Sequence, residues 1–333
     1  MSEEKMAVQP EPILKVEHLT KTFTIKSSKV FGKPSYLNAV NDVSFEVREG
    51  ETLGIIGESG CGKSTLGKSI LKLINPTSGS VVFDGKDILS LSSKEMTALR
   101  REMNIIFQDP YSSLDPRKTA GYQIEEPMII HNIGTPEERK QKVNELLKLV
   151  GLDYYHAIRY PHEFSGGQRQ RINIARALAL GPKLLVCDEP VSALDVSVQA
   201  QVINLLKELK QKFKLTYLFI SHDLGVVKYI SDRIVIMYLG KIVEIGNAKE
   251  IYEKPYHPYT EALFSAIPPA SPMEQKKKIT LTGEIPSPLN MPKGCAFSTR
   301  CPHCTQRCRE EIPPLCTVDG DHQVACFLYQ GTK

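Results

Sequence analysis

The sequence predicts an α/β domain with a largely parallel sheet, followed by a Pro-rich segment and a Cys-rich tail. Short apolar strands alternate with amphipathic helices up to about residue 250. One of these strands runs into a glycine-rich turn that opens a helix, and six of the eight cysteines fall in residues 295–333. We expect the domain at residues 1–254, the Pro-rich segment at 255–294 and the tail at 295–333.

The expected elements follow the hydrophobic pattern along the chain. The helix at 137–150 places Val143, Leu146, Leu147 and Val150 on one face. Further helices are expected at 63–72 and, between a glycine pair and Gly181-Pro182, at 169–180. Alternating or continuous apolar runs predict strands at 13–17, 43–47, 52–56, 184–187 and 217–220.

Composition excludes several classes of protein. The 42 basic and 38 acidic side chains give a net charge of +4, too little to argue for nucleic-acid binding. No apolar run approaches the roughly 18–20 residues that cross a bilayer. The polar start, residues 1–12, has no apolar core, so we expect no signal peptide. Without secretion, a cysteine-rich tail favours a metal site over disulfides.

Residues 57–64 form a phosphate-binding motif, G-x-x-x-x-G-K-S, directly after a predicted strand. The turn and the helix N-terminus together direct N–H groups at an anion. Lys63 is expected to reach the β- and γ-phosphates, Ser64 to ligate Mg²⁺ and Thr65 to contact a phosphate oxygen. A chance glycine turn is the competing interpretation. The expected nucleotide contacts here are Gly57, Glu58, Ser59, Gly60, Cys61, Gly62, Lys63, Ser64 and Thr65.

A second feature is the strand at 184–187, which ends in two carboxylates, Asp188 and Glu189. Such a pair by itself is usually a solvated turn. With a phosphate loop upstream, Asp188 is better interpreted as the carboxylate that holds Mg²⁺ through water. Glu189 then lies where a water attacks the γ-phosphate, so we expect it to act as the general base.

The third feature is the segment Ser165, Gly166, Gly167 and Gln168, whose glycines open a helix and create a second anion site. An ordinary helix cap is the alternative. With the two earlier motifs, this segment resembles the signature of ATP-binding cassette (ABC) proteins. The resemblance implies further nucleotide contacts at four positions, namely Phe23 on adenine, Gln108 in the Q-loop, Asp195 in the D-loop and His222 in the H-loop. Tyr36 is the alternative to Phe23 on adenine.

The resemblance implies a fold and a mechanism. The fold is a RecA-like core with an antiparallel β subdomain and a helical subdomain. The catalytic residues are Glu189, His222, Gln108 and Lys63, and Mg²⁺ is held by Ser64, Gln108 and Asp188. Two cassettes pair head to tail and trap two ATP molecules between phosphate loop and signature. The chain has one copy of each motif, so it must pair either with itself or with a similar chain.

Longer stretches are similar to the ATPase subunits of oligopeptide and dipeptide ABC importers, and closer to the F-type than to the D-type subunit. They are residues 107–116, 160–164, 191–199 and 257–260. This similarity implies a Mg²⁺-dependent ATPase on the cytoplasmic face of the cell membrane. Its implied partners are a second ATPase subunit, two transmembrane permease subunits and an external substrate-binding protein, with no nucleic acid. Nickel and oligosaccharide importers of the same family are alternative assignments of cargo.

Two other classes compete with a transporter subunit. A soluble cassette ATPase of DNA repair or translation usually carries two cassettes or a long coiled-coil insertion. Lys63 and Ser165 are too close in sequence for a long insertion to lie between them. A basic zinc tail would support that class, but acidic residues balance its basic ones. A P-loop kinase or GTPase explains neither the second anion site nor His222.

The segment after Gln108, up to Tyr160, is expected to dock the membrane subunits. It is mostly helical and carries three apolar residues that we expect to be exposed, and core packing of the helical subdomain is the alternative. These residues are Met128, Ile129 and Ile130.

The tail cysteines predict a metal site. Four thiolates from one short chain suit zinc or an iron–sulfur cluster, and the C-x-x-C spacing of Cys301 and Cys304 favours zinc. The family resemblance implies a [4Fe–4S] cluster, with zinc as the second choice, and leaves Cys304 and Cys316 as spare thiols or substitute ligands. The cluster ligands that it implies are Cys295, Cys301, Cys308 and Cys326.

Overall fold

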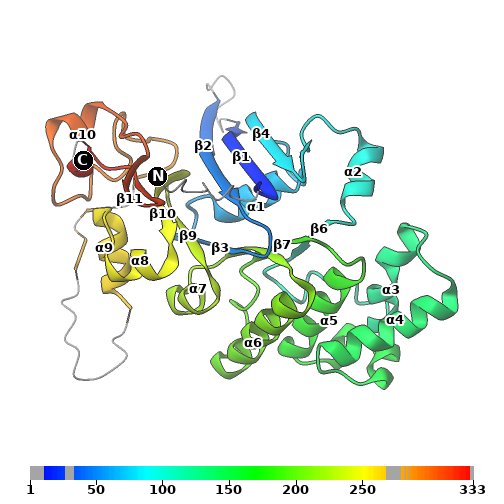
Figure 1. Ribbon diagram of the computed structural model, residues 1–333. Helices are drawn as coiled ribbons and strands as arrows, with labels where there is room; N and C mark the ends of the chain where they lie inside the picture. Colours follow the sequence, from blue (N-terminus) through cyan, green and yellow to red (C-terminus); the bar gives the residue numbers. More distant parts are fainter. Residues whose placement is uncertain (1–10, 27–33, 268–278, 282, 285, 331–333) are drawn as a thin grey trace, which may run out of the picture.

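The computed structural model describes residues 11–26, 34–267, 279–281, 283–284 and 286–330 (Figure 1). Its core is an eight-stranded sheet of order β11-β12-β10-β9-β3-β8-β7-β6. The run β9-β3-β8-β7-β6 is parallel, and β10, β12 and β11 extend it antiparallel. The strands are β3 (Thr52–Ile56), β6 (Met103–Ile106), β7 (Leu184–Asp188), β8 (Thr216–Ile220), β9 (Arg233–Tyr238), β10 (Lys241–Asn247), β11 (Cys316–Asp319) and β12 (His322–Val324).

A second, antiparallel sheet of order β2-β1-β4-β5 packs with helix α1 (Lys63–Ile70) over one face of the main sheet. Side chains alternate along each main-sheet strand, so Leu53 and Ile55 join the core with this small sheet, whereas Ile56 faces the opposite core. The strands of the small sheet are β1 (Leu14–Ile25), β2 (Ser35–Val47), β4 (Ser78–Phe83) and β5 (Lys86–Asp87).

The other face of the main sheet packs against helices, and Figure 1 shows α3 and α4 at the end of the molecule away from the Cys-rich tail. These and the remaining helices are α2 (Ser93–Leu99), α3 (Ala120–Ile130), α4 (Pro136–Leu149), α5 (Gly166–Leu178), α6 (Val196–Phe213), α7 (Leu224–Ile230), α8 (Ala248–Glu253), α9 (Pro258–Ser265) and α10 (Gln306–Glu310). Short 3-10 turns span Tyr154–Ile158, Pro161–Glu163 and Phe327–Tyr329. In the described part of the chain, no helix combines the length and hydropathy needed to cross a bilayer.

The predicted strands and helices are confirmed, with shifts at their ends. The helix expected at 169–180 begins at Gly166 and ends at Leu178. Its early start has a local cause, because the Ser165 Oγ accepts from the Gln168 N–H while the Gln168 side chain accepts from the Ser165 N–H. The α/β fold class is therefore confirmed, including the antiparallel and helical parts.

The Cys-rich tail adds strands to the main sheet, which the sequence analysis did not predict. Strand β12 pairs with β10, and β11 pairs with β12. A buried hydrogen bond fastens this junction, because His322 Nε2 lies 2.7 Å from Glu244 Oε1 and both residues are at most 2% exposed. The tail thus continues the main sheet at its β10 edge.

The expectation that Met128 is exposed was wrong. Its side chain is 3% exposed and belongs to the core that α3 forms with α4 and α5. The next two residues of α3 do reach the surface, since Ile129 is 36% and Ile130 63% exposed. A helix turns by about 100° per residue, so three consecutive positions cannot share one face.

Candidate functional site

Four parallel strands end side by side at one edge of the main sheet, and each is followed by a residue that the sequence analysis singled out. The strand order β3-β8-β7-β6 brings together Gly57 after β3, His222 after β8, Glu189 after β7 and Gln108 after β6. The carboxyl ends of strands in an open α/β sheet are where ligands usually bind. Residues far apart in sequence therefore meet at one place.

The phosphate loop connects β3 to α1 through a tight turn. Gly62 has φ 103°, and a Cβ there would lie 1.9 Å from the Ala39 carbonyl oxygen, so only glycine fits. Lys63, which is 5% exposed, points its Nζ back to the carbonyl oxygens of Gly57 at 2.7 Å and Glu58 at 3.0 Å. The lysine ammonium thus lies over the loop, where a phosphate bound by the loop meets it.

Ser64 and Asp188 form a compact set of oxygen ligands beside this loop. The Ser64 hydroxyl donates to Asp188 Oδ1 at 2.6 Å, and Asp188 is 2% exposed. Lys68 Nζ lies 3.7 Å from the other carboxylate oxygen. A hydroxyl and a carboxylate are the hard oxygen donors that suit Mg²⁺, so the residues present fit this ion.

Glu189 is the centre of a three-residue cluster. Its Oε2 accepts from Gln108 Nε2 at 2.9 Å and lies 3.1 Å from His222 Nδ1. The Glu189 backbone has φ 48°, a left-handed conformation that non-glycine residues adopt at a cost and mainly where structure demands it. This arrangement positions one carboxylate between an amide and an imidazole.

The signature segment and the D-loop lie at helix starts. Ser165 caps α5, and a Cβ on Gly167 would lie 2.4 Å from Val198 Cγ1, so this glycine permits the close packing of α5 on α6. Asp195 precedes α6 without a side-chain capping bond. Among the described residues, no hydrogen bond or ion pair joins Ser165 or Asp195 to the phosphate loop. The structure of one chain therefore does not assemble these residues with the loop.

Phe23, the predicted adenine contact, lies on β1 with partial exposure, and Lys21 Nζ is 4.9 Å from its ring centre. In the β1–β2 register it is opposite Leu37. Its place on the small sheet is separate from the strand-end cluster.

The sequence analysis missed two contacts to the phosphate loop. The buried Tyr259 hydroxyl accepts from the Glu58 N–H at 3.0 Å, and Arg300 Nη1 lies 3.0 Å from Glu58 Oε1. These partners follow Glu58 by 201 and 242 positions. No local pattern in the sequence signals contacts over such separations.

The four predicted cluster cysteines line one cavity in the tail, whereas Cys304 and Cys316 do not. Burial raises the pKa of the Cys295 thiol to about 11, and its neighbours Cys308, Cys326 and Cys301 contribute in the same direction. Within the described residues, no group of three or more His, Cys, Asp or Glu side chains is arranged to hold a single metal ion. The prediction of a metal site is therefore not confirmed.

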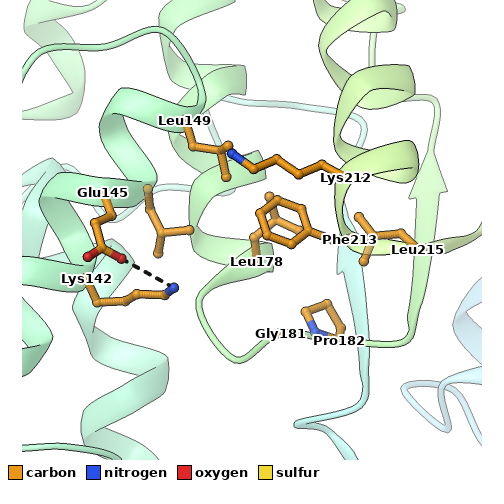
Figure 2. A pocket seen from close by; sticks show the side chains of 10 residues that line it. Lys142, Glu145, Leu149, Leu178, Gly181, Pro182, Lys212, Phe213 and Leu215 are labelled. Atoms are coloured by element: carbon orange, nitrogen blue, oxygen red, sulfur yellow. Dashed lines mark ion pairs between the residues drawn. The ribbon is translucent and has the colours of Figure 1, made fainter.

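A separate pocket of about 530 Å³ lies between α4 and the C-terminal ends of α5 and α6 (Figure 2). Leu149, Leu178 and Phe213 give it apolar walls, and Lys142 pairs with Glu145 at its rim over 3.6 Å. It contains none of the predicted site residues.

Comparisons with known proteins agree with this geometry. The family model for ABC transporters matches residues 40–192, and the model for the oligopeptide/dipeptide transporter C-terminal region matches residues 243–308. The chain is 52% identical over 326 residues to the oligopeptide transport ATP-binding protein AppF of Bacillus subtilis, covering 97% of this chain and 99% of that relative. It is 48% identical to the di/tripeptide transport ATP-binding protein DppF of Pseudomonas aeruginosa, with coverage of 95% and 97%.

A solved structure shares the fold. It is the dimeric ATP-binding cassette MJ0796 in a post-hydrolysis state bound to ADP and Pi, at a TM-score of 0.63 and 32% identity. The match covers 71% of this chain and 98% of that one. With the phosphate loop, the strand-end cluster and both family regions present, the chain belongs to the ABC transporter ATP-binding proteins, in the group with the oligopeptide/dipeptide transporter C-terminal region.

Proposed function

We propose that this chain is the ATP-hydrolysing subunit that powers import of di- and oligopeptides through a membrane ABC transporter. The observation that carries the proposal is the oligopeptide/dipeptide C-terminal region, which follows a cassette with a complete strand-end site. The names of relatives that match nearly the whole chain support the peptide cargo.

In the proposed mechanism, Lys63 and the loop N–H groups bind the ATP phosphates. Ser64, Asp188 and Gln108 would hold Mg²⁺, which would neutralise charge on the phosphates. Glu189 takes the proton of the attacking water, and its hydrogen bond to Gln108 holds the carboxylate in place. His222 lies against the same carboxylate and supports the γ-phosphate side of the site. Phe23 stacks on adenine.

We propose that the site is completed by a second cassette. In the described part of the chain, the signature and D-loop residues make no hydrogen bond or ion pair to the chain's own phosphate loop, and the structural relative was solved as a dimer. These residues are Ser165, Gly166, Gly167, Gln168 and Asp195. The signature helix would then direct its N-terminus at the ATP of the partner. A hetero-pair with a similar subunit, two permease subunits and an external binding protein form the proposed assembly, peripheral to the cytoplasmic face of the membrane.

For docking on the permease, we propose the exposed end of α3. Ile129 and Ile130 present apolar surface there, in the segment that follows Gln108. Because Gln108 contacts Glu189, movement at this surface is linked to the catalytic carboxylate.

In the tail, we propose a [4Fe–4S] cluster on Cys295, Cys301, Cys308 and Cys326. The four residues line one small cavity, and four thiolates from one short segment are a ligand set for such a cluster. The family resemblance favours this cluster, and Zn²⁺ on the same four sulfurs is the second choice.

The experiment that tests the function is purification of the tagged chain from detergent-solubilised membranes of its native host, followed by uptake assays. We expect a second cassette and two polytopic proteins to co-purify, and the reconstituted complex to import labelled di- and oligopeptides with ATP. Import of nickel or an oligosaccharide without peptide import would refute the assignment of peptides as the cargo. Association with nucleic acid and no membrane protein would refute the transporter role.

A further inference from the structure

The phosphate loop is joined to the Cys-rich tail by one well-shielded ion pair. Arg300 Nη1 lies 3.0 and 3.1 Å from the two carboxylate oxygens of Glu58, and 3.4 Å from the Tyr238 hydroxyl. The Arg300 side chain is 9% exposed and that of Glu58 25%. Solvent and salt screen such a pair far less than a surface pair, so its loss has a measurable effect.

The same loop residue is also held by its backbone. The Glu58 N–H donates to the Tyr259 hydroxyl, and Tyr259 is fully buried. The Tyr259 ring packs on Tyr238 at 4.7 Å and on Phe297 at 5.5 Å between ring centres. Residues from β9, α9 and the tail thus form one rigid aromatic support for Glu58.

Glu58 is a direct neighbour of the phosphate-binding groups. Its carbonyl oxygen accepts from Lys63 Nζ at 3.0 Å, and it forms part of the turn whose N–H groups surround the phosphates. A shift of Glu58 therefore moves the lysine and the turn together. Arg300 is placed to set the position of both without touching the nucleotide.

Arg300 immediately precedes Cys301, which lines the tail cavity with three other cysteines. A compact turn connects them, because the Arg300 N–H donates to the Phe297 carbonyl at 3.0 Å and the Cys295 N–H donates to the Cys308 carbonyl at 2.8 Å. Any change in the spacing of the cavity cysteines is transmitted along this turn to the Arg300 side chain.

We propose that Arg300 is a positioning residue that couples the cysteine cavity to the phosphate loop through Glu58. An intact cavity strengthens ATP binding, and bound nucleotide in turn protects the cysteines, since coupling between two sites is reciprocal. The inference rests on the proposed nucleotide binding at the loop. A second arginine offers a matched control, because Arg48 also joins core to tail, through Asp321 at 2.9 Å, but on an exposed surface.

The test uses the full-length chain purified without air. Variants R300Q, E58Q, the double R300Q/E58Q, R300K and the control R48A are compared by equilibrium binding of a fluorescent ATP analogue. We expect R300Q and E58Q to weaken binding about tenfold, and the double variant no more than either single one. R300K should recover part of the affinity, and R48A should stay within about twofold of wild type.

A second readout uses chain that has been treated with a chelator and desalted, so that Cys301 carries no metal. Its alkylation by iodoacetamide is measured by mass spectrometry with and without ATP. ATP should slow this reaction in wild type and R48A but not in R300Q or E58Q. Wild-type affinity in R300Q, or equal protection of Cys301 by ATP in R300Q and wild type, would overturn the link. If R300Q does not fold, E58Q decides by the same two criteria. Failure of the wild-type chain to bind ATP would instead refute the proposed function.

Discussion

Gln108 Nε2 donates a hydrogen bond to Glu189 Oε2 over 2.9 Å, joining the segment after β6 to the end of β7. Gln108 begins the stretch that runs into the exposed end of α3, and Glu189 is the proposed base. The contact therefore connects the surface proposed to meet the permease with the group proposed to activate water. His222 approaches the same oxygen at 3.1 Å from the other side.

Substitution of the base should separate binding from turnover. E189Q keeps the size of the side chain and its contact with Gln108 but cannot accept a proton. We expect near-normal ATP affinity, kcat lower by about 10²- to 10⁴-fold and accumulation of an ATP-bound pair. Single-turnover hydrolysis and light scattering after size-exclusion chromatography measure these effects. Near-wild-type turnover in E189Q would show that Glu189 is not the general base.

Removal of the loop lysine should abolish most nucleotide binding. In K63A the phosphates lose a buried counter-charge, and we expect affinity for ATP to fall by about tenfold or more. Equilibrium binding of a fluorescent analogue is the measurement. The matched control is K86A, an exposed lysine on β5, which should bind as wild type does. Equal affinities in the two variants would contradict the assigned role of Lys63.

Charge at the end of α3 should uncouple hydrolysis from transport. I129E and I130E put a carboxylate on surface that we propose to be buried against the permease, where desolvation is costly. We expect peptide uptake in proteoliposomes to fall about tenfold or more while the isolated chain still hydrolyses ATP. L73E changes an exposed leucine elsewhere and should leave uptake intact. Normal uptake in a folded I130E would place the docking surface on another part of the chain.

Stability should depend on pH through His257. Burial lowers the pKa of this imidazole to about 4, from about 6.5 in the unfolded chain. The proton therefore binds the unfolded chain more tightly, so stability is complete above about pH 6.5 and declines as the pH falls towards 4. Between about pH 7.5 and about pH 5 we expect a loss on the order of 2 kcal/mol in the free energy of unfolding.

Urea unfolding at both pH values measures this loss, and H257N provides its control. Asparagine can replace His257 Nδ1 as the acceptor of the Tyr259 N–H at the start of α9, but it does not titrate. The variant should lose less stability than wild type over the same range. Equal losses in the two proteins would show that His257 is not the group responsible.

The tail should contain iron. Protein purified without air should be brown, with absorbance near about 400 nm and about four irons per chain. C301S should lose the iron, whereas C304S and C316S should keep it, because those two residues do not line the cavity. Stoichiometric zinc without iron, in protein never exposed to air, would refute the iron–sulfur assignment in favour of a zinc site.

Much of the site follows from short stretches of sequence. The phosphate loop, the carboxylate pair after β7 and the signature cap each depend on residues within about ten positions, where backbone geometry and neighbouring side chains decide the structure. The strand at 52–56 and the helix at 137–150 were predicted for the same reason, because a continuous apolar run marks the first and an apolar face at helical spacing marks the second. The order of the motifs along the chain also indicated the family.

Only the tertiary structure decided how distant segments meet. Strand β11 has only four residues, too few for a clear pattern in the sequence, and it pairs with β12, which itself pairs with β10 at the sheet edge. Met128 is buried because α4 and α5 cover its side of α3. Glu58 belongs to a local motif, but its pairing with Arg300 depends on the tail folding back beside the loop. Such contacts depend on which surfaces become buried together, and no local window of sequence contains that information.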